Sequence, residues 1–223
     1  MAQAMSGSDS PASRRTLCAA CALPLPACLC EWVRPVANRV ELIVLQHPQE
    51  QYQAKGTVRL LSRCLQRCRV LVGEQFDPAD LLALGLHEAG TALLYPLDES
   101  ADAGAWPQAK EPARLVLLDA TWRKSRKLLH LNPLLQQLPR LALAASALPP
   151  SRYAIRKAQR PEQQRSSLEA AVLALQQVES QGQTPAAAEA VAAKYAPLWA
   201  GFEGFVAQRQ GLVSARPQSE SEG

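Results

Sequence analysis

Short apolar runs alternate with amphipathic segments through most of the chain. The apolar runs have the length of buried strands and cover residues 39–46, 69–72, 91–95, 114–119 and 140–144. The segments between them place apolar residues at helical spacing and predict helices over residues 53–68, 78–87 and 122–130. Because strands and helices alternate at the spacing of βαβ units, we expect an α/β fold with a mainly parallel sheet and flanking helices.

Two further helical segments follow, at residues 168–179 and 185–208. Thr184 and Pro185 begin the second as its cap and first residue, and Pro197 is expected to bend or split it. Residues 1–16 and 214–223 are mostly small and polar, so we expect both ends to be disordered. Between them we expect a cysteine-rich element at residues 17–33 and one α/β domain with C-terminal helices at residues 34–213.

Membrane insertion is not expected. No segment has the unbroken apolar length that spans a bilayer, and no hydrophobic stretch follows Arg14 and Arg15 near the N-terminus. The length of 223 residues and the apolar fraction of 48% are ordinary for one soluble domain with a sizeable core. We therefore expect a cytoplasmic protein without membrane contact.

The basic residues are unevenly distributed along the chain. The net charge is only +4, but between residues 114 and 165 eleven lysines and arginines are opposed by two acids, Asp119 and Glu162. Two sets of arginines spaced four residues apart predict basic stripes on helices: Arg59, Arg63 and Arg67, and Arg152, Arg156 and Arg160. Dispersed cations suit the phosphates of RNA or DNA, whereas solvated helix faces are the alternative interpretation.

Four cysteines lie close together near the N-terminus, at Cys18, Cys21, Cys28 and Cys30. Their spacing, C-x2-C-x6-C-x-C, gives two close pairs of soft ligands, as a tetrahedral zinc site requires. A disulfide pair and unligated thiols are the alternatives, and the expected cytoplasmic location disfavours a disulfide. The other two cysteines, Cys64 and Cys68, are four residues apart beside leucines and are expected to pack in the core.

A lone carboxylate, Asp119, ends the apolar run of residues 115–118. Ligands of open α/β sheets bind beside the carboxyl ends of the strands, so Asp119 is a candidate site residue. The loop after the first strand carries Gly56 and Thr57 at a helix start, where backbone N–H groups can bind a carboxylate or phosphate. A solvated helix cap is the alternative interpretation of this loop.

Several motifs together resemble one family. Asp119-x-Thr121-Trp122 resembles the signature of the DTW-domain proteins. Further matching positions, in the family's order, are the paired cysteines, His47-Pro48-x-Glu50, Thr57-x-Arg59-Leu60, Arg126-Lys127, Asn132-Pro133, Ser151-x-Tyr153-x-Ile155-Arg156 and Ser167-x-Glu169-Ala170. The resemblance extends from Cys18 to Glu179. Gly56 stands where members usually have Asn, and Ser167 where many have Thr.

The resemblance implies a tRNA-uridine aminocarboxypropyltransferase. Such an enzyme transfers the 3-amino-3-carboxypropyl group of S-adenosylmethionine to N3 of a tRNA uridine and releases 5'-methylthioadenosine. The resemblance also implies a SPOUT-like fold with a C-terminal trefoil knot. An RNA methyltransferase of SPOUT type and a non-catalytic, zinc-stabilised RNA-binding module are the alternatives, and the sequence leaves open whether the protein is a monomer or a homodimer.

The resemblance and the chemistry of the side chains together imply a role for each of these residues. Asp119 is expected to act as general base or as the acceptor that orients uracil N3–H. Trp122 is expected to stack on a base or to pack in the core. The expected catalytic residues are Asp119, Thr121 and Trp122. The expected cofactor-binding residues are His47, Glu50, Gly56, Thr57, Arg59, Ser167 and Glu169. The expected RNA-binding residues are Arg123, Lys124, Arg126, Lys127, Arg152, Tyr153 and Arg156.

Overall fold

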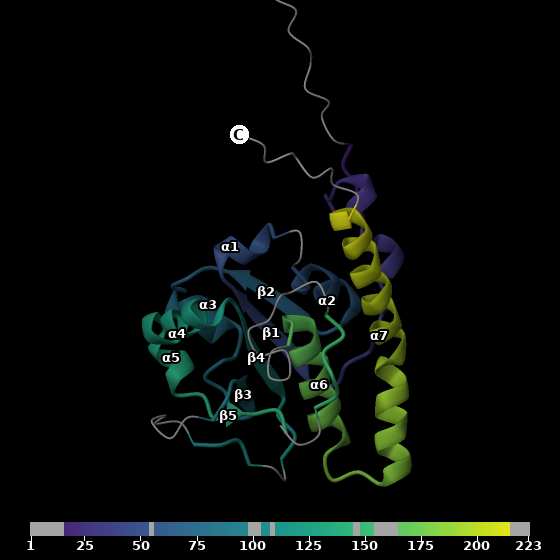
Figure 1. The fold of residues 1–223 in the computed structure, drawn as a ribbon. Helices are drawn as coiled ribbons and strands as arrows, with labels where there is room; N and C mark the ends of the chain where they lie inside the picture. Colours follow the sequence, from purple (N-terminus) through teal and green to yellow (C-terminus); the bar gives the residue numbers. More distant parts are fainter. Residues whose placement is uncertain are drawn as a thin grey trace, which may run out of the picture.

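A sheet of five parallel strands forms the centre of the computed structural model, which describes residues 16–53, 56–97, 104–107, 110–144, 148–153 and 165–214. The strand order is β2-β1-β4-β3-β5 (Figure 1). The strands are β1 (Glu41–Gln46), β2 (Cys68–Val72), β3 (Thr91–Leu94), β4 (Arg114–Asp119) and β5 (Arg140–Leu141). Every neighbouring pair is parallel, which confirms the expected α/β class and parallel sheet.

The two central strands, β1 and β4, run in register from Glu41 opposite Arg114 to Gln46 opposite Asp119. Their apolar residues are buried on both faces, as expected of continuous apolar runs in a parallel sheet. Because parallel strands end at the same edge, the register places Gln46 beside Asp119 at the carboxyl edge of the sheet.

Helices cover both faces of the sheet. The helices are α1 (Pro48–Gln51), α2 (Val58–Cys64), α3 (Pro78–Ala83), α4 (Trp122–Leu131), α5 (Pro133–Gln136), α6 (Ser167–Ser180) and α7 (Pro185–Ser214). One buried apolar cluster joins the sheet to α2, α6 and α7, and a second joins the other face to α3, α4 and α5 (Figure 1). The fold is therefore a layered α/β structure, with α7 packed outside α6.

One predicted helix is shorter than expected. The pattern predicts a helix over residues 53–68, but α2 ends at Cys64 and β2 begins at Cys68. Leu65 leaves the helix in an extended conformation and forms a bridge with Val36, so a tertiary pairing overrides the helical pattern. Arg67 consequently lies outside the helix, and the predicted stripe of Arg59, Arg63 and Arg67 on one helix is wrong.

Other boundaries differ less. Helix α3 ends at Ala83 rather than at residue 87, just before Gly85, whose φ of 75° is in the left-handed region. Helix α7 continues through Pro197 to Ser214 and is not split there. In the second predicted stripe, Arg156 and Arg160 lie outside the described residues, as do the predicted disordered ends apart from Thr16 and Ser214.

Both cysteines outside the N-terminal group pack against the core, as predicted. Cys64 is buried, and Cys68, on β2 rather than on a helix, is partly buried against the same cluster. Burial raises the pKa of Cys64, and it raises the pKa of Cys68 to about 12. Both side chains therefore remain neutral thiols near pH 7.

The cysteine-rich element packs on α7. It contains two short 3-10 helices, η1 (Leu25–Ala27) and η2 (Cys30–Trp32), which both contact α7. A Cβ atom at Gly204 would collide with the Trp32 ring, and one at Gly201 would collide with the Trp32 carbonyl oxygen. Gly204 thus makes room in α7 for the indole of Trp32, and Gly201 for its backbone carbonyl. None of the helices in the described ranges combines the length and apolar character needed to cross a lipid bilayer.

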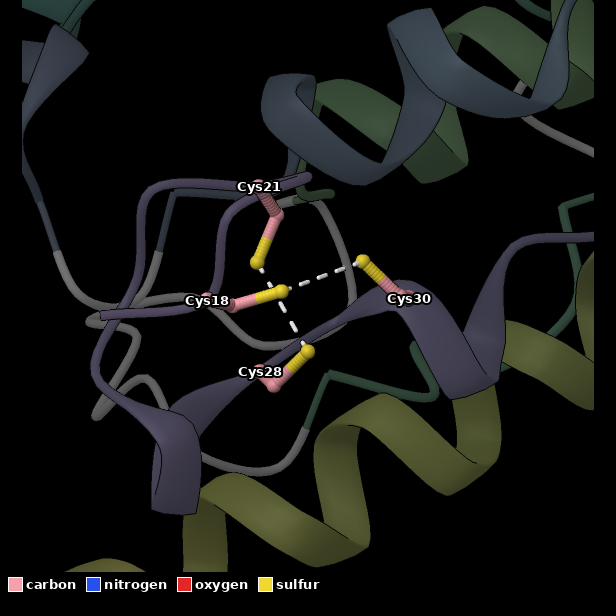
Figure 2. A group of neighbouring side chains, drawn as sticks. All are labelled: Cys18, Cys21, Cys28 and Cys30. Carbon is pink, nitrogen blue, oxygen red and sulfur yellow. Dashed lines mark hydrogen bonds between the residues drawn. The ribbon is translucent and has the colours of Figure 1, made fainter. Parts of the chain in front are cut away.

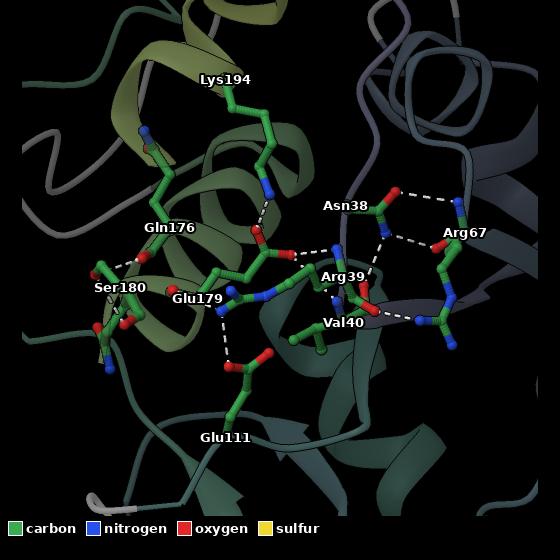
Figure 3. A network of polar contacts seen from close by, with 10 residues as sticks. Asn38, Arg39, Val40, Arg67, Glu111, Gln176, Glu179, Ser180 and Lys194 are labelled. Atoms are coloured by element: carbon green, nitrogen blue, oxygen red, sulfur yellow. Dashed lines mark hydrogen bonds and ion pairs between the residues drawn. The ribbon is translucent and has the colours of Figure 1, made fainter. Parts of the chain in front are cut away.

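A buried carboxylate joins α6 and α7 to the start of β1 (Figure 3). Glu179 is fully buried and accepts hydrogen bonds from the backbone N–H groups of Arg39 at 2.6 Å and Val40 at 3.1 Å. Its second oxygen pairs with Lys194 on α7, and its backbone carbonyl accepts a bond of 2.7 Å from the Arg39 guanidinium. These contacts hold the C-terminal helices against the amino edge of the sheet.

We expect Glu179→Ala to lower the free energy of unfolding by about 3 kcal/mol, because it leaves two backbone donors and the partly exposed Lys194 ammonium without their acceptor. Urea denaturation measures this change. Glu111→Ala is the matched control: Glu111 pairs with Arg39 at 2.8 Å, but its side chain is 36% exposed. The control is expected to cost at most about 1 kcal/mol. Equal losses in the two variants would contradict this assignment.

Candidate functional site

The carboxylate of Asp119 is held by donors from two neighbouring elements. Gln46 Nε2, at the end of β1, donates to Asp119 Oδ2 at 2.7 Å. The hydroxyl of Ser167, the first residue of α6, donates to Asp119 Oδ1. The backbone also contributes, because the N–H of His47 donates to the Asp119 carbonyl at 3.0 Å. The acid is therefore fixed in orientation at the centre of the carboxyl edge.

A cavity of about 290 Å³ lies at the β1 and β2 side of this edge; Asp119 does not line it, but its hydrogen-bond partner Gln46 does. Gln46 lines it, together with three of the predicted cofactor-binding residues, Glu50, Gly56 and Arg59. Glu50 pairs with Lys124 at 3.0 Å, and Arg59 donates to the Gln51 carbonyl at 3.0 Å. The cavity wall thus offers a carboxylate, a guanidinium and backbone groups within one short segment.

The first turn of α6 gathers further predicted residues. Ser166 and Glu169 form a capping box, in which each side chain accepts from the other residue's backbone N–H. Glu169 is buried and also accepts from the Ser151 hydroxyl at 3.0 Å and the Arg152 backbone N–H at 2.7 Å. The Thr57 hydroxyl accepts from the Leu168 backbone N–H at 3.2 Å. Thr57 and Glu169 therefore position the helix that holds Asp119, and their contact with a ligand stays a prediction.

His47 and α4 are joined through Glu74. His47 caps α1, because its Nδ1 accepts from the Gln49 N–H at 3.2 Å, while its Nε2 lies 3.1 Å from a Glu74 oxygen. Lys127 pairs with the other Glu74 oxygen at 2.9 Å. The hydrogen bond from Lys127, followed by that from His47, lowers the pKa of Glu74. Lys127 and His47 thus orient the loop after β1 against α4.

Trp122, the first residue of α4, is on the surface. Its side chain is 56% exposed, which excludes the predicted alternative of a core position. Its ring stacks on Tyr95, which follows β3, with centroids 5.2 Å apart and an angle of 14° between the planes. Thr121 is the N-cap residue, although its side chain makes no capping hydrogen bond. Trp122 is therefore an exposed indole held against a buried tyrosine, three residues after Asp119.

The predicted RNA-binding residues have different surroundings. Arg123 and Arg126 are exposed on α4, and no acid of the described ranges pairs with either of them. Arg152 pairs with Glu203 on α7, and Tyr153 is 6% exposed and stacks on Phe202, so its ring belongs to the core. Arg156 lies outside the described residues. Contact of these residues with RNA stays a prediction.

The four N-terminal thiols converge on one point (Figure 2). All four sulfur atoms lie within 4.8 Å of one another, with Cys18 and Cys30 at 3.8 Å and Cys21 and Cys28 at 3.7 Å. No disulfide joins them. A tetrahedral ion with sulfur bonds of about 2.3 Å places its ligands about 3.8 Å apart. The cluster therefore has the geometry of a four-cysteine metal site.

Two residues of this region are not predicted from the sequence. Gln46 bonds to Asp119 and lines the cavity, and its only signal is that a polar residue ends an otherwise apolar run. Tyr95 supports Trp122, but at the end of an apolar run it is predicted only as part of a strand. The strand order that brings both residues to Asp119 is not legible from the sequence.

Comparison with known proteins places the chain in a family. A family model described as the DTW domain matches residues 15–210. Proteins named tRNA-uridine aminocarboxypropyltransferase 2 are similar to the chain. The protein from Mus musculus is 33% identical over 172 residues, which are 74% of this chain and 57% of that protein. The protein from Drosophila melanogaster is 32% identical over 181 residues, which are 78% of this chain and 70% of that protein.

A third relative, from Macaca fascicularis, is 31% identical over 175 residues and is again matched over 57% of its length. The chain thus spans somewhat more than half the length of the mouse and macaque relatives. No solved structure matches it significantly. Because the family model covers most of the sequence, from the cysteine-rich element into the last turns of the C-terminal helix, the chain belongs to the DTW domain family.

Proposed function

We propose that this protein is a tRNA-uridine aminocarboxypropyltransferase, which transfers the 3-amino-3-carboxypropyl group of S-adenosylmethionine to N3 of a tRNA uridine. The names of the similar proteins support the reaction and the tRNA substrate. The observation that carries the proposal is the fixed carboxylate of Asp119 at the carboxyl edge of the sheet, bonded to Gln46, which lines the cavity there. When bound, S-adenosylmethionine supplies an electrophilic carbon next to its sulfonium, with 5'-methylthioadenosine as the leaving group.

Asp119 is proposed to accept the N3–H of the uracil. Uracil N3 becomes a better nucleophile when its proton is taken up, and an oriented carboxylate can take that proton or hold the N–H in line. Gln46 and Ser167 hold the two carboxylate oxygens from different sides, which supports a defined direction for this hydrogen bond. Attack on the aminocarboxypropyl carbon rather than the methyl group is then a matter of positioning.

The cavity is proposed to receive the amino-acid end of S-adenosylmethionine. That end carries an ammonium and a carboxylate, and the cavity wall contains Glu50 and Arg59, whose charges are complementary. Backbone groups near Gly56 and Thr57 add donors for a carboxylate. The proposed cofactor-binding residues are His47, Glu50, Gly56, Thr57, Arg59, Ser167 and Glu169.

Trp122 and α4 are proposed to face the tRNA. An exposed indole next to exposed arginines combines a stacking surface with phosphate contacts, the two features that bind unpaired nucleotides. Thr121 and Trp122 complete the proposed catalytic residues. The proposed RNA-binding residues are Arg123, Lys124, Arg126, Lys127, Arg152 and Arg156, whereas the prediction that Tyr153 stacks on a base is withdrawn because its ring is buried against Phe202.

The four-thiol cluster is proposed to hold a structural zinc ion. Sulfur separations of 3.7 and 3.8 Å fit the tetrahedral coordination that zinc adopts with thiolates. Cys18, Cys21, Cys28 and Cys30 would occupy all four positions, which leaves none for a substrate. The ion would therefore stabilise the N-terminal element and take no part in the transfer.

The finer fold assignment is also a proposal. We infer a SPOUT-like arrangement with a C-terminal trefoil knot from the resemblance to DTW proteins, and the parallel five-stranded sheet is compatible with it. The N-terminal element at residues 17–33 and the catalytic domain at residues 34–213 are proposed as the functional units. A cytoplasmic location is proposed because tRNA is the substrate.

We expect Asp119→Asn to slow the transfer by about 100-fold to 10,000-fold, the contribution of a positioned acid or base. The reaction with unmodified tRNA is followed by release of 5'-methylthioadenosine and by mass spectrometry of the tRNA nucleosides. Asp80→Asn, which alters an exposed aspartate on α3, is the control and should retain wild-type activity. A variant at Asp119 with wild-type activity would refute the proposed role.

The same assay separates the alternative functions. Release of S-adenosylhomocysteine by the wild-type protein, with a methylated tRNA, would establish a methyltransferase instead. Binding of tRNA without either product would establish a non-catalytic RNA-binding module.

We expect Arg123→Ala and Arg126→Ala each to weaken tRNA binding and to lower the slope of log Kd against log salt by about 0.7–0.9, because each removes one phosphate contact. Filter binding at several salt concentrations measures the slope. Lys110→Ala removes an exposed cation at the opposite, amino edge of the sheet and should leave the slope unchanged. Wild-type slopes in Arg123→Ala and Arg126→Ala, as in the control, would exclude α4 as the RNA-binding face.

We expect the purified protein to contain about one zinc ion per chain by elemental analysis, and Cys21→Ser to contain much less. Removing the ion with a chelator should lower the unfolding temperature by about 10 °C, since structural zinc contributes several kcal/mol and about 2–4 °C accompanies each kcal/mol at this chain length. Wild-type protein without zinc, and with an unfolding temperature insensitive to chelator, would contradict a zinc site.

A further inference from the structure

Arg209, near the end of α7, is a buried cation. Its side chain is 5% exposed, and its guanidinium carbon lies 4.7 Å from the centroid of the Phe205 ring. One nitrogen donates to the backbone carbonyl of Ala27 at 2.8 Å. Nε and Nη1 have no hydrogen-bond partner, and no carboxylate pairs with the group, within the part of the chain that the structure describes. Arg209 therefore differs from the surface arginines of this protein.

An unpaired guanidinium is costly in such a place. Burial of a charge without a partner costs several kcal/mol, so buried arginines are normally paired with an anion. Burial lowers the pKa of Arg209, whereas Tyr153 and the thiols of Cys21 and Cys28 act in the opposite direction. Arg59 also lies close enough to lower that pKa, so the neighbouring arginine adds positive charge rather than compensating for it. The groups that can carry a compensating charge here include the N-terminal thiols.

The position of Arg209 relative to the thiols is fixed by two hydrogen bonds. Arg209 holds the carbonyl of Ala27, and Gln208 Nε2 holds the carbonyl of Cys28 at 3.0 Å. The Ala27 carbonyl lies in the segment between the two cysteine pairs, and the Cys28 carbonyl belongs to the second pair. Helix α7 runs directly beside the four-thiol cluster (Figure 2). The buried cation and the cluster thus share one interface, joined across 182 residues of sequence.

We propose that Arg209 provides the compensating positive charge for a divalent metal bound by Cys18, Cys21, Cys28 and Cys30. The inference rests on the metal site proposed above. Four thiolates with one divalent ion carry a net charge of 2−, which is itself costly beside the apolar core. A guanidinium buried next to this centre reduces that cost, and the centre in turn supplies the anion that Arg209 lacks. The metal site is therefore composite, with four ligands near the N-terminus and its counter-charge on the C-terminal helix.

This arrangement couples metal binding to the docking of α7. A metal ion that gains affinity from Arg209 must, by linkage, stabilise the position of Arg209 to the same extent. Helix α7 also packs on α6, the helix whose first residue bonds to Asp119.

The test is the zinc affinity of three variants, measured by competition with a chromophoric zinc chelator. Arg209→Met keeps the apolar packing and removes the charge, and its zinc affinity should fall by about 10-fold or more. Arg209→Lys keeps the charge and should retain affinity within about threefold of wild type. Arg63→Met is the matched control, because Arg63 also donates to a carbonyl of this element, that of Ala20 at 2.6 Å, but lies on the surface. Its affinity should be that of wild type.

Each other outcome overturns a specific step. Wild-type affinity in Arg209→Met would refute the charge role. An equal loss in Arg209→Met and Arg209→Lys would assign the effect to packing and likewise overturn the inference. An equal loss in Arg63→Met would show that any carbonyl contact has this effect, which also overturns it. Failure of the wild-type protein to bind zinc would overturn the metal proposal itself, and none of these results depends on activity with tRNA.

Discussion

The pairing of β1 with β4 is the constraint on which the candidate site depends. Both strands are apolar and buried on two faces, and a slip of one residue would exchange the faces of every side chain. The core therefore fixes a register in which Gln46 and Asp119 end the strands side by side. The hydrogen bond between Gln46 and Asp119 is a consequence of that register. Ser167, at the start of α6, completes the orientation of the carboxylate by donating to its other oxygen.

The first turn of α6 combines structural and candidate chemical roles. Its capping box satisfies the free N–H groups of the helix, and the Glu169 carboxylate also fixes residues 151 and 152. The same turn presents Ser167 to Asp119 and receives the hydroxyl of Thr57 through the Leu168 N–H. If a change at Thr57 or Glu169 lowered activity, the loss could come from a displaced α6 as well as from a lost contact with the substrate. Asp119 is the better residue for testing chemistry, since its carboxylate ends a strand rather than caps a helix.

The sequence predicts local features of this fold better than long-range ones. Strands β1, β3 and β4 are legible because continuous apolar runs mark strands buried on both faces, and the cysteine spacing is itself local. The helix at residues 53–68 is too long in the prediction because Leu65 pairs with Val36, a contact between distant segments. Tyr153 looks like an exposed aromatic residue among arginines, but α7 covers it. The isolation of Arg209 likewise depends on where α7 packs, which no local pattern specifies.

The most direct measurement of the central claim is a crystal structure of the protein with S-adenosylmethionine. If Asp119 receives the proton of the attacking nitrogen, the aminocarboxypropyl carbon next to sulfur must lie within about 6 Å of its carboxylate, the sum of a near-attack distance of about 3.3 Å and a hydrogen bond of about 2.8 Å. We predict that geometry at the carboxyl edge of the sheet. Binding of the cofactor with that carbon remote from Asp119, or at another face of the protein, would contradict the account.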